Sequence, residues 1–426
     1  VQSEPEQLSL FAMDTYMTVT AYGPEAEKGM KDAEERIRQI ESELSVTDPA
    51  SEIYGINHGT GTVISVGNDT EEVLRAALAL SGKTGGALDP TLYPAAEAWG
   101  FTGEKQQVPD EETLRDALAR TGWERIRLAD GNLYRPEGME IDLGAVGKGF
   151  AGREAGRILR ARGVTSAVLS LGGNIEAVGV RPDGTPWRIG VRAPDAEGHA
   201  GMLLVKNEAV VTSGSYERYF TDADGHRWHH ILNPASGRPA ENGLLSVTVI
   251  GPDGLICDGL STALFVMGRE KAEDFWRIRG GFEMILIEEG RHIGRTGKVL
   301  HGPAGIHGGG SGGAAAMKKW QTAGLGLALG AVCALTGCGG TPSAHTAEIV
   351  QNGRVLRTVD LSSVTQEERI TVSGKAGTNT ILIAPGEIRM LSADCPDQIC
   401  VKTGKLQENG LPVVCLPHRL AIQWAE

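Results

Sequence analysis

Basic residues, cysteines and long apolar runs are all scarce in this chain of 426 residues. Its 41 lysines and arginines are outnumbered by 54 acidic residues, which gives a net charge of −13 at pH 7. No basic stripe can therefore replace phosphate counterions, and we expect no nucleic-acid partner. The first three hundred residues contain a single cysteine, Cys257. With 41% hydrophobic and 22% charged residues, the composition is that of an ordinary globular protein with two or three domains.

The only notable apolar run follows a glycine-rich stretch. Residues 308–316, Gly-Gly-Gly-Ser-Gly-Gly-Ala-Ala-Ala, are typical of a flexible linker. The segment 317–340 has a basic start after Met317, an apolar middle and small residues before Cys338, which is the pattern of a bacterial lipoprotein signal. Its apolar run is shorter than the about 20 residues that a spanning helix needs. A plain hydrophobic tether is the alternative. The position of the signal inside the chain suggests that two reading frames have been joined.

We therefore expect an α+β chain, with a mixed α/β domain over 1–307 and a small all-β module over 341–426. Apolar periodicity predicts helices over Glu25–Leu44, Glu71–Ser81, Asp110–Arg120 and Leu255–Met267. Gly268 is expected to cap the last of these helices. Runs of β-forming residues predict strands over 167–171, 203–205, 245–250, 381–383 and 421–424.

Paired histidines open a sharply bent loop over 229–239, His-His-Ile-Leu-Asn-Pro-Ala-Ser-Gly-Arg-Pro. Loops on a rigid scaffold often carry catalysis, and an imidazole can move protons near neutral pH. A hairpin turn with solvated histidines is the alternative.

A second candidate site lies on the predicted helix over 255–267. Asp258 and Thr262 are four residues apart and share a face, and Ser261 lies beside them. A carboxylate with hydroxyls is a hard-oxygen set that suits Mg²⁺. Alternatively, the aspartate stabilises the first helical turn and the threonine bonds back to the helix.

Glycine-rich turns follow two predicted strands. The stretch 141–150, Ile-Asp-Leu-Gly-Ala-Val-Gly-Lys-Gly-Phe, predicts a turn that leads into a helix over Arg153–Arg162. Glycines let the backbone approach a phosphate or metal, and Lys148 offers a cation for a diphosphate. The spacing of a P-loop is absent. Further polar or aromatic segments, each more often structural when taken alone, are 172–174, 212–216 and 86–101.

The order of these motifs along the chain is specific. Over about residues 8–300 the sequence resembles the FAD:protein FMN transferase family, the ApbE flavin transferases. The resemblance places contacts to FAD at Met13, Thr47, Ala87, Leu88, Asp89, Asp142, Lys148 and Leu232. The ordered motifs add Gly172, Gly173, Asn174 and Ser213 to this cofactor-binding set. Mg²⁺ is expected at the oxygen of Ala145 and the side chains of Asp258, Ser261 and Thr262. Three positions depart from the family pattern, with Thr47 in place of an aromatic residue, Asn233 in place of Asp and Gly259 in place of Ala.

The resemblance implies a Mg²⁺-dependent enzyme that transfers FMN from FAD to a Ser or Thr hydroxyl of a client flavoprotein and releases AMP. The catalytic residues would be His230, or Asp258 through the metal shell, which would take the hydroxyl proton. The alternatives are an FAD diphosphatase that gives FMN and AMP, and a non-catalytic FAD-binding module.

The last segment, about residues 345–426, resembles the NusG domain II-like module of small bacterial lipoproteins. Its motif holds Cys395, Cys400, Cys415 and His418, which could ligate zinc, although an exported domain favours a disulfide that leaves one cysteine unpaired. We expect an extracytoplasmic protein that a lipid or apolar anchor attaches to the bacterial membrane, with an export signal removed before Val1.

Overall fold

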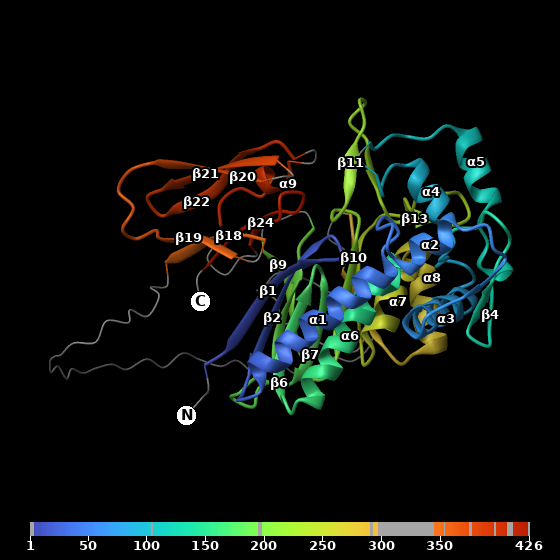
Figure 1. Cartoon of the computed structure of the whole chain (residues 1–426), viewed down its shortest axis with the longest axis horizontal. Coiled ribbons are helices and arrows are strands. Elements are labelled where there is room, and N and C mark those ends of the chain that lie inside the picture. Colours follow the sequence, from blue (N-terminus) through green and yellow to red (C-terminus); the bar gives the residue numbers. More distant parts are fainter. Residues whose placement is uncertain are drawn as a thin grey trace, which may run out of the picture. The chain divides into compact units, whose positions relative to one another are not determined.

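The computed structural model comprises two compact units, Val1–Ile306 and His307–Glu426 (Figure 1). It describes residues 4–103, 105–194, 198–289, 293–296, 345–352, 354–374, 377–395, 398–406 and 412–424. The predicted linker 308–316 and the signal-like segment 317–340, with its two cysteines, lie outside the described residues. Within the described residues, no helix combines the length and the apolar character that crossing a membrane requires.

An eight-stranded sheet forms the centre of the first unit, and every pair of neighbouring strands is antiparallel. In spatial order its strands are β1 (Glu6–Ala12), β2 (Thr15–Tyr22), β6 (Ser166–Leu171), β7 (Asn174–Gly179), β10 (Ala209–Gly214), β15 (Leu244–Gly251), β16 (Glu283–Glu288) and β17 (Ile293–Arg295). Long insertions between β2 and β6 and between β10 and β15 interrupt this simple meander. Those insertions carry most of the predicted site residues.

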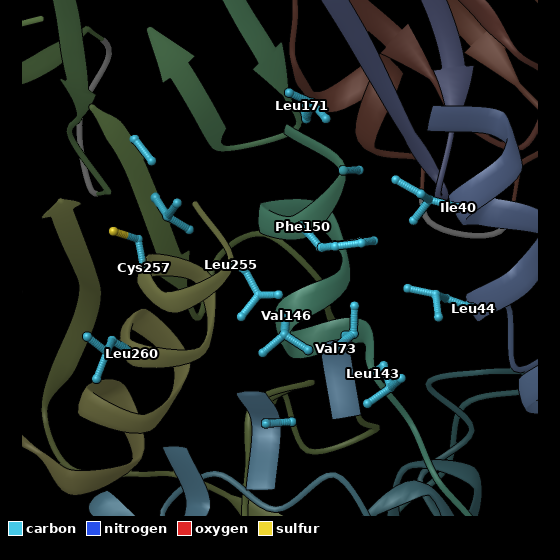
Figure 2. Close-up of a cluster of buried hydrophobic side chains, with 14 of the residues drawn as sticks. Ile40, Leu44, Val73, Leu143, Val146, Phe150, Leu171, Leu255, Cys257 and Leu260 are labelled. Carbon is cyan, nitrogen blue, oxygen red and sulfur yellow. The ribbon is translucent and has the colours of Figure 1, made fainter. Parts of the chain in front are cut away.

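Three helices pack together against one face of the sheet, namely α1 (Ala26–Leu44), α6 (Gly144–Ala161) and α7 (Gly254–Met267). Figure 2 shows Phe150 and Val146 of α6 between Ile40 and Leu44 of α1 on one side and Leu255 of α7 on the other. All five side chains are buried in one large apolar core. The periodicity that predicted the first and last of these helices is confirmed, and so is the cap, because Gly268 adopts a φ of 76°.

The prediction for the middle helix is wrong at its start. Residues 144–152 form the first turns of α6 and not a turn that precedes a helix over Arg153–Arg162. Glycine disfavours helices in isolation, but here close packing outweighs that preference. A Cβ on Gly149 would lie 2.1 Å from the Gly254 carbonyl oxygen of α7, and a Cβ on Gly156 would lie 2.9 Å from Glu176. The glycines therefore let α6 lie unusually close to α7 and the sheet.

The insertion between β2 and β6 adds a helical region beside this core. It contains α2 (Glu52–His58), α3 (Asn68–Lys83), α4 (Tyr93–Ala98), α5 (Glu111–Ala119), a 3₁₀ turn (Trp123–Arg125) and a small sheet of β3 (Val63–Ser65), β5 (Asn132–Tyr134) and β4 (Arg127–Ala129). The predicted helices over 71–81 and 110–120 correspond to α3 and α5. Asp110 caps α5 by accepting a hydrogen bond from the Thr113 N–H.

Smaller elements complete the unit. The hairpin of β8 (Trp187–Arg192) and β9 (His199–Val205) packs its apolar residues on strands β10, β15 and β16 of the large sheet. The chain between β10 and β15 forms two further hairpins, and one helix follows α7. These elements are β11 (Tyr219–Thr221) with β12 (Arg227–His229), β13 (Leu232–Asn233) with β14 (Arg238–Pro239), and α8 (Arg269–Arg279).

The second unit is rich in β structure and has its own apolar core. One sheet has the order β19 (Arg354–Asp360), β18 (Thr346–Gln351), β24 (Leu420–Trp424) and β23 (Val413–Cys415). The other consists of β20 (Glu368–Gly374), β21 (Gly377–Ala384) and β22 (Glu387–Ala393), followed by the short helix α9 (Ile399–Lys402). The mixed α/β first unit and β-rich second unit confirm the expected α+β class.

Candidate functional site

Helix α7 places Asp258 inside the first unit. The helix is capped by Asp253, whose carboxylate accepts hydrogen bonds from the N–H groups of Leu255 and Ile256. Asp258 is therefore not the residue that stabilises the helix start, and that alternative is wrong. Its side chain is 5% exposed, and its Oδ2 accepts a hydrogen bond of 2.7 Å from the Gly149 N–H of α6.

Hydroxyl groups gather on the next turn of α7. Ser213 at the end of β10 has its Oγ 2.7 Å from the Ser261 Oγ and 3.2 Å from the Thr262 Oγ1. The Ser261 hydroxyl also donates to the backbone carbonyl of Asp258 at 2.8 Å. Two elements thus supply three hydroxyl oxygens within one turn of a buried carboxylate, which are the ligand types that Mg²⁺ prefers.

Ala145 approaches this group through the first turns of α6. The N–H of Gly149, four residues after Ala145 in α6, donates to the Asp258 carboxylate. Asp258 consequently lies one hydrogen bond away from the backbone turn that carries the Ala145 oxygen.

Asn174, at the start of β7, is the clearest sign that this region binds a further group. Asn174 is 4% exposed, and its amide lies beside the Asp258 carboxylate, where it opposes the rise in that group's pKa, although no acceptor among the described residues lies at ordinary hydrogen-bond distance from the amide nitrogen. A buried amide whose hydrogen bonds are incomplete costs free energy, so an acceptor that arrives with a ligand would relieve this cost.

The positive charge of Lys148 acts on several of the predicted site residues. Burial raises the pKa of Asp258, and the rise is opposed by the Lys148 charge, the Gly149 N–H and the neighbouring Asn174. Burial likewise raises the pKa of Asp142, against the Gly144 N–H and the charges of Arg218 and Lys148. Both carboxylates therefore lie within the field of one lysine, and both are costly to ionise without an added cation.

His230 belongs to the same electrostatic group. Burial, followed by the positive charges of Arg218 and Lys148, lowers the pKa of His230 to about 3. Its Nδ1 lies 3.1 Å from the backbone oxygen of Arg218 and donates to it, because a carbonyl can only accept. The tautomer that follows leaves Nε2 as the unprotonated nitrogen. His229 is 8% exposed, and burial lowers its pKa to about 4.

The predicted segment 87–89 is tied to Asp142 through the backbone, since the Asp142 N–H donates to the Pro90 oxygen at 2.8 Å. Leu88 is buried in the main core. The Asp89 carboxylate accepts from the N–H and the hydroxyl of Thr91, at 2.8 and 2.6 Å. Two of the three residues of this segment are therefore engaged, Leu88 in packing and Asp89 in a local turn.

Two hairpin turns bring further predicted residues close to α6 and β10. Met13 has a φ of 50°, and its methyl carbon would lie 3.3 Å from a Cβ on Gly147. Gly172 has a φ of 58° and leaves no room for a side chain, because a Cβ would lie 2.0 Å from the Thr15 Oγ1. The Gly173 oxygen accepts from the Thr212 N–H at 3.2 Å, next to Ser213.

The last two predicted contacts differ from each other. Leu232, in β13, is buried among Trp99 and its neighbours. Thr47 lies exposed in the turn after α1 and bonds locally to Ser45. At Gly259, one of the departures from the family pattern, a Cβ would lie 2.4 Å from the Leu80 Cδ1, so an alanine there would require the Leu80 side chain to shift.

Sequence reasoning missed two residues beside His230. The Arg218 backbone oxygen accepts bonds from the backbone N–H and the ring of His230, and the positive charge of Arg218 lowers the pKa of His230 against the opposing effect of the ring bond. The Phe101 ring stands at 74° to the His230 ring, with centroids 6.5 Å apart. Arg218 could have been predicted as a site residue because it is a cation two residues after the motif 212–216. No feature of the sequence predicts that Phe101 lies next to His230.

Two family models match parts of this chain. The model of the ApbE family matches residues 13–286, and that of NusG domain II matches residues 324–426. The FAD:protein FMN transferase of Klebsiella pneumoniae strain 342 is 36% identical over 264 residues, which cover 60% of this chain and 81% of that protein. The Treponema pallidum FAD:protein FMN transferase is 33% identical over 270 residues, 59% of this chain and 74% of that protein.

Solved structures show the same relationship. The ApbE protein of Thermotoga maritima is 32% identical, with a TM-score of 0.65 over 69% of this chain and 97% of that one. The apo form of the Pseudomonas stutzeri flavinyl transferase ApbE is 30% identical, with a TM-score of 0.62 over 70% of this chain and 96% of that one.

Proposed function

The chain belongs to the ApbE family and is a FAD:protein FMN transferase, and from that premise we propose the chemistry of its transfer. The reaction depends on Mg²⁺, joins FMN to a Ser or Thr hydroxyl of a client flavoprotein, and releases AMP. The acceptor oxygen forms a bond to the phosphorus of the FMN half of FAD. The bond from that phosphorus to the bridging oxygen breaks, and AMP leaves with the electron pair.

The convergence around Asp258 carries this proposal. One buried carboxylate, the hydroxyls of Ser213, Ser261 and Thr262, and the backbone at Ala145 form a hard-oxygen set that fits Mg²⁺. The buried amide of Asn174, which lies beside Asp258, could donate to an oxygen of the bound diphosphate. Bound Mg²⁺ would neutralise the diphosphate and the charge that grows on the leaving phosphate.

His230 is suited to receive the proton of the acceptor hydroxyl. Its lowered pKa keeps the imidazole neutral at pH 7, and the bond to the Arg218 oxygen leaves Nε2 free to accept. An anionic diphosphate beside the ring favours the protonated form, so substrate binding raises its basicity. Lys148 and Arg218 provide positive charge next to this position.

An assay with and without an acceptor tests the reaction type. The chain is incubated with FAD and Mg²⁺, and AMP is measured in the presence and absence of a flavoprotein domain that carries an acceptor Ser or Thr. Transfer predicts AMP release that requires the acceptor. AMP release at the same rate without it would show an FAD diphosphatase, and no AMP in either case would show a binding module.

We further propose that the protein is extracytoplasmic and attached to the bacterial membrane through residues 317–340. The lipoprotein-like pattern of that segment supports the placement. Protease treatment of intact cells should digest the transferase unit. Survival in intact cells with digestion only after lysis would show that it faces the cytoplasm.

A further inference from the structure

We propose that Cys395, Cys400 and Cys415 of the second unit form a three-thiolate site for a soft metal ion of the zinc class, with one coordination position left open. This site goes beyond the proposed flavin transfer and does not depend on it.

Three separate elements bring the sulfurs together. Cys395 follows β22, Cys400 lies in α9, and Cys415 ends β23. All three side chains are buried, with exposures of 1–2%. Their Sγ atoms lie within 4.8 Å of one another, and those of Cys395 and Cys400 are 3.6 Å apart.

These distances suit a common metal ion. A tetrahedral zinc ion with Zn–S bonds of about 2.3 Å holds two thiolates about 3.8 Å apart. A disulfide needs only two sulfurs and leaves the convergence of the third without a purpose. No disulfide links any cysteine that the structure describes.

His418 is not the fourth ligand that the C-x2-H spacing suggests. Its Nδ1 lies 2.5 Å from the Asn379 Oδ1, and its Nε2 lies 3.1 Å from the Asp394 Oδ1. The amide nitrogen of Asn379 in turn points at the Cys400 Sγ, 3.9 Å away. Both ring nitrogens are thus engaged, and the histidine acts behind the thiols through Asn379, as outer-shell partners of metal ligands do.

A pocket adjoins this arrangement. It has a volume of about 450 Å³, and its walls include Gly377, His418 and Arg419. Gly377 is required where it stands, because a Cβ there would lie 2.3 Å from the His418 Nε2. The pocket therefore reaches His418, which contacts Asn379 beside the thiols, and none of the three cysteines lines it.

Titration of the reduced full-length chain with Cd²⁺ tests the site, because thiolate coordination produces an ultraviolet charge-transfer absorption. Every protein in the test carries Cys333→Ser and Cys338→Ser, so that only the described cysteines contribute. We expect one equivalent of Cd²⁺ to bind, Zn²⁺ to compete for it, and either ion to raise the melting temperature.

Matched variants locate the ligands. The Cys415→Ser variant should bind Cd²⁺ at least about 10-fold more weakly, whereas Cys257→Ser, which replaces the buried thiol of the first unit, should bind it normally. The absorption and the melting temperature are also measured on the parent chain itself, so the test remains valid if the Cys415→Ser variant does not fold. A reduced parent chain that shows neither the absorption nor the stabilisation overturns the proposal. So does equal Cd²⁺ affinity of the parent and Cys415→Ser.

Discussion

Replacing Asp258 by Asn tests whether its charge, and not its shape, is what the site needs. The amide oxygen of Asn can still accept the Gly149 N–H, which now donates at 2.7 Å, so the contact between α6 and α7 should persist. Burial raises the pKa of Asp258, which means that the ionised carboxylate costs stability when no cation is bound. The metal-free variant should therefore be at least as stable as the parent.

Although Asp258→Asn should not lower the stability of the metal-free protein, it should lower the activity strongly. Losing an outer-shell partner of a metal ligand costs 10–100-fold, so losing the only carboxylate among the named ligands should cost more than about 100-fold in AMP release, or about 2.7 kcal/mol. Mg²⁺ should also no longer raise the melting temperature. Both are measured at fixed FAD and acceptor, across a Mg²⁺ titration.

Asp274→Asn is the matched control, because this exposed carboxylate of α8 pairs only with Arg277 on its own helix among the described residues. It should leave activity and the Mg²⁺ response unchanged. The reasoning fails if Asp258→Asn keeps Mg²⁺-dependent activity near that of the parent, or if it loses activity only because the metal-free fold has become unstable.

Three other changes test separate parts of the site and its scaffold. His230→Ala should slow transfer by roughly 10²–10⁴-fold while FAD still binds; lost binding with normal turnover at saturating FAD would make His230 a ligand contact instead. Gly149→Ala should lower the free energy of unfolding by about 1–3 kcal/mol, since its Cβ would lie 2.6 Å from the Asp258 Cβ, whereas Gly55→Ala in α2 has open space and should not destabilise; equal denaturation midpoints would contradict the close-packing argument. Burial raises the pKa of Glu176 despite its bond to Arg160, so the carboxyl ionises more easily in the unfolded chain than in the folded one. As the pH rises from 4.5, the parent should therefore lose stability relative to Glu176→Gln. A difference in unfolding free energy that does not change with pH would refute this.

Local patterns predicted local structure well. Helix α1 was predicted to within one residue because Met30, Ala33, Ile37 and Ile40 repeat at the helical period and all are buried. The start of α6 was missed because its glycines indicate a turn until their neighbours are known. Only the three-dimensional structure shows that Gly149 lies against Gly254 of another helix.

The site could be predicted as a set of residues but not as a geometry. Asp258, Ser261 and Thr262 share one helix, so their spacing indicated a common face. The contribution of Ser213 arises from the pairing of β10 with β15, which lies far along the chain. The burial of Asn174 beside Asp258 is visible only after folding, because the two residues are far apart in the sequence.

The intact mass of the acceptor domain tests the central claim most directly. After incubation with the chain, FAD and Mg²⁺, the domain should gain one FMN phosphoester. Replacing its acceptor Ser or Thr by Ala, or using the Asp258→Asn enzyme, should abolish that gain. An acceptor whose mass stays unchanged while FAD is converted to FMN and AMP would contradict the account.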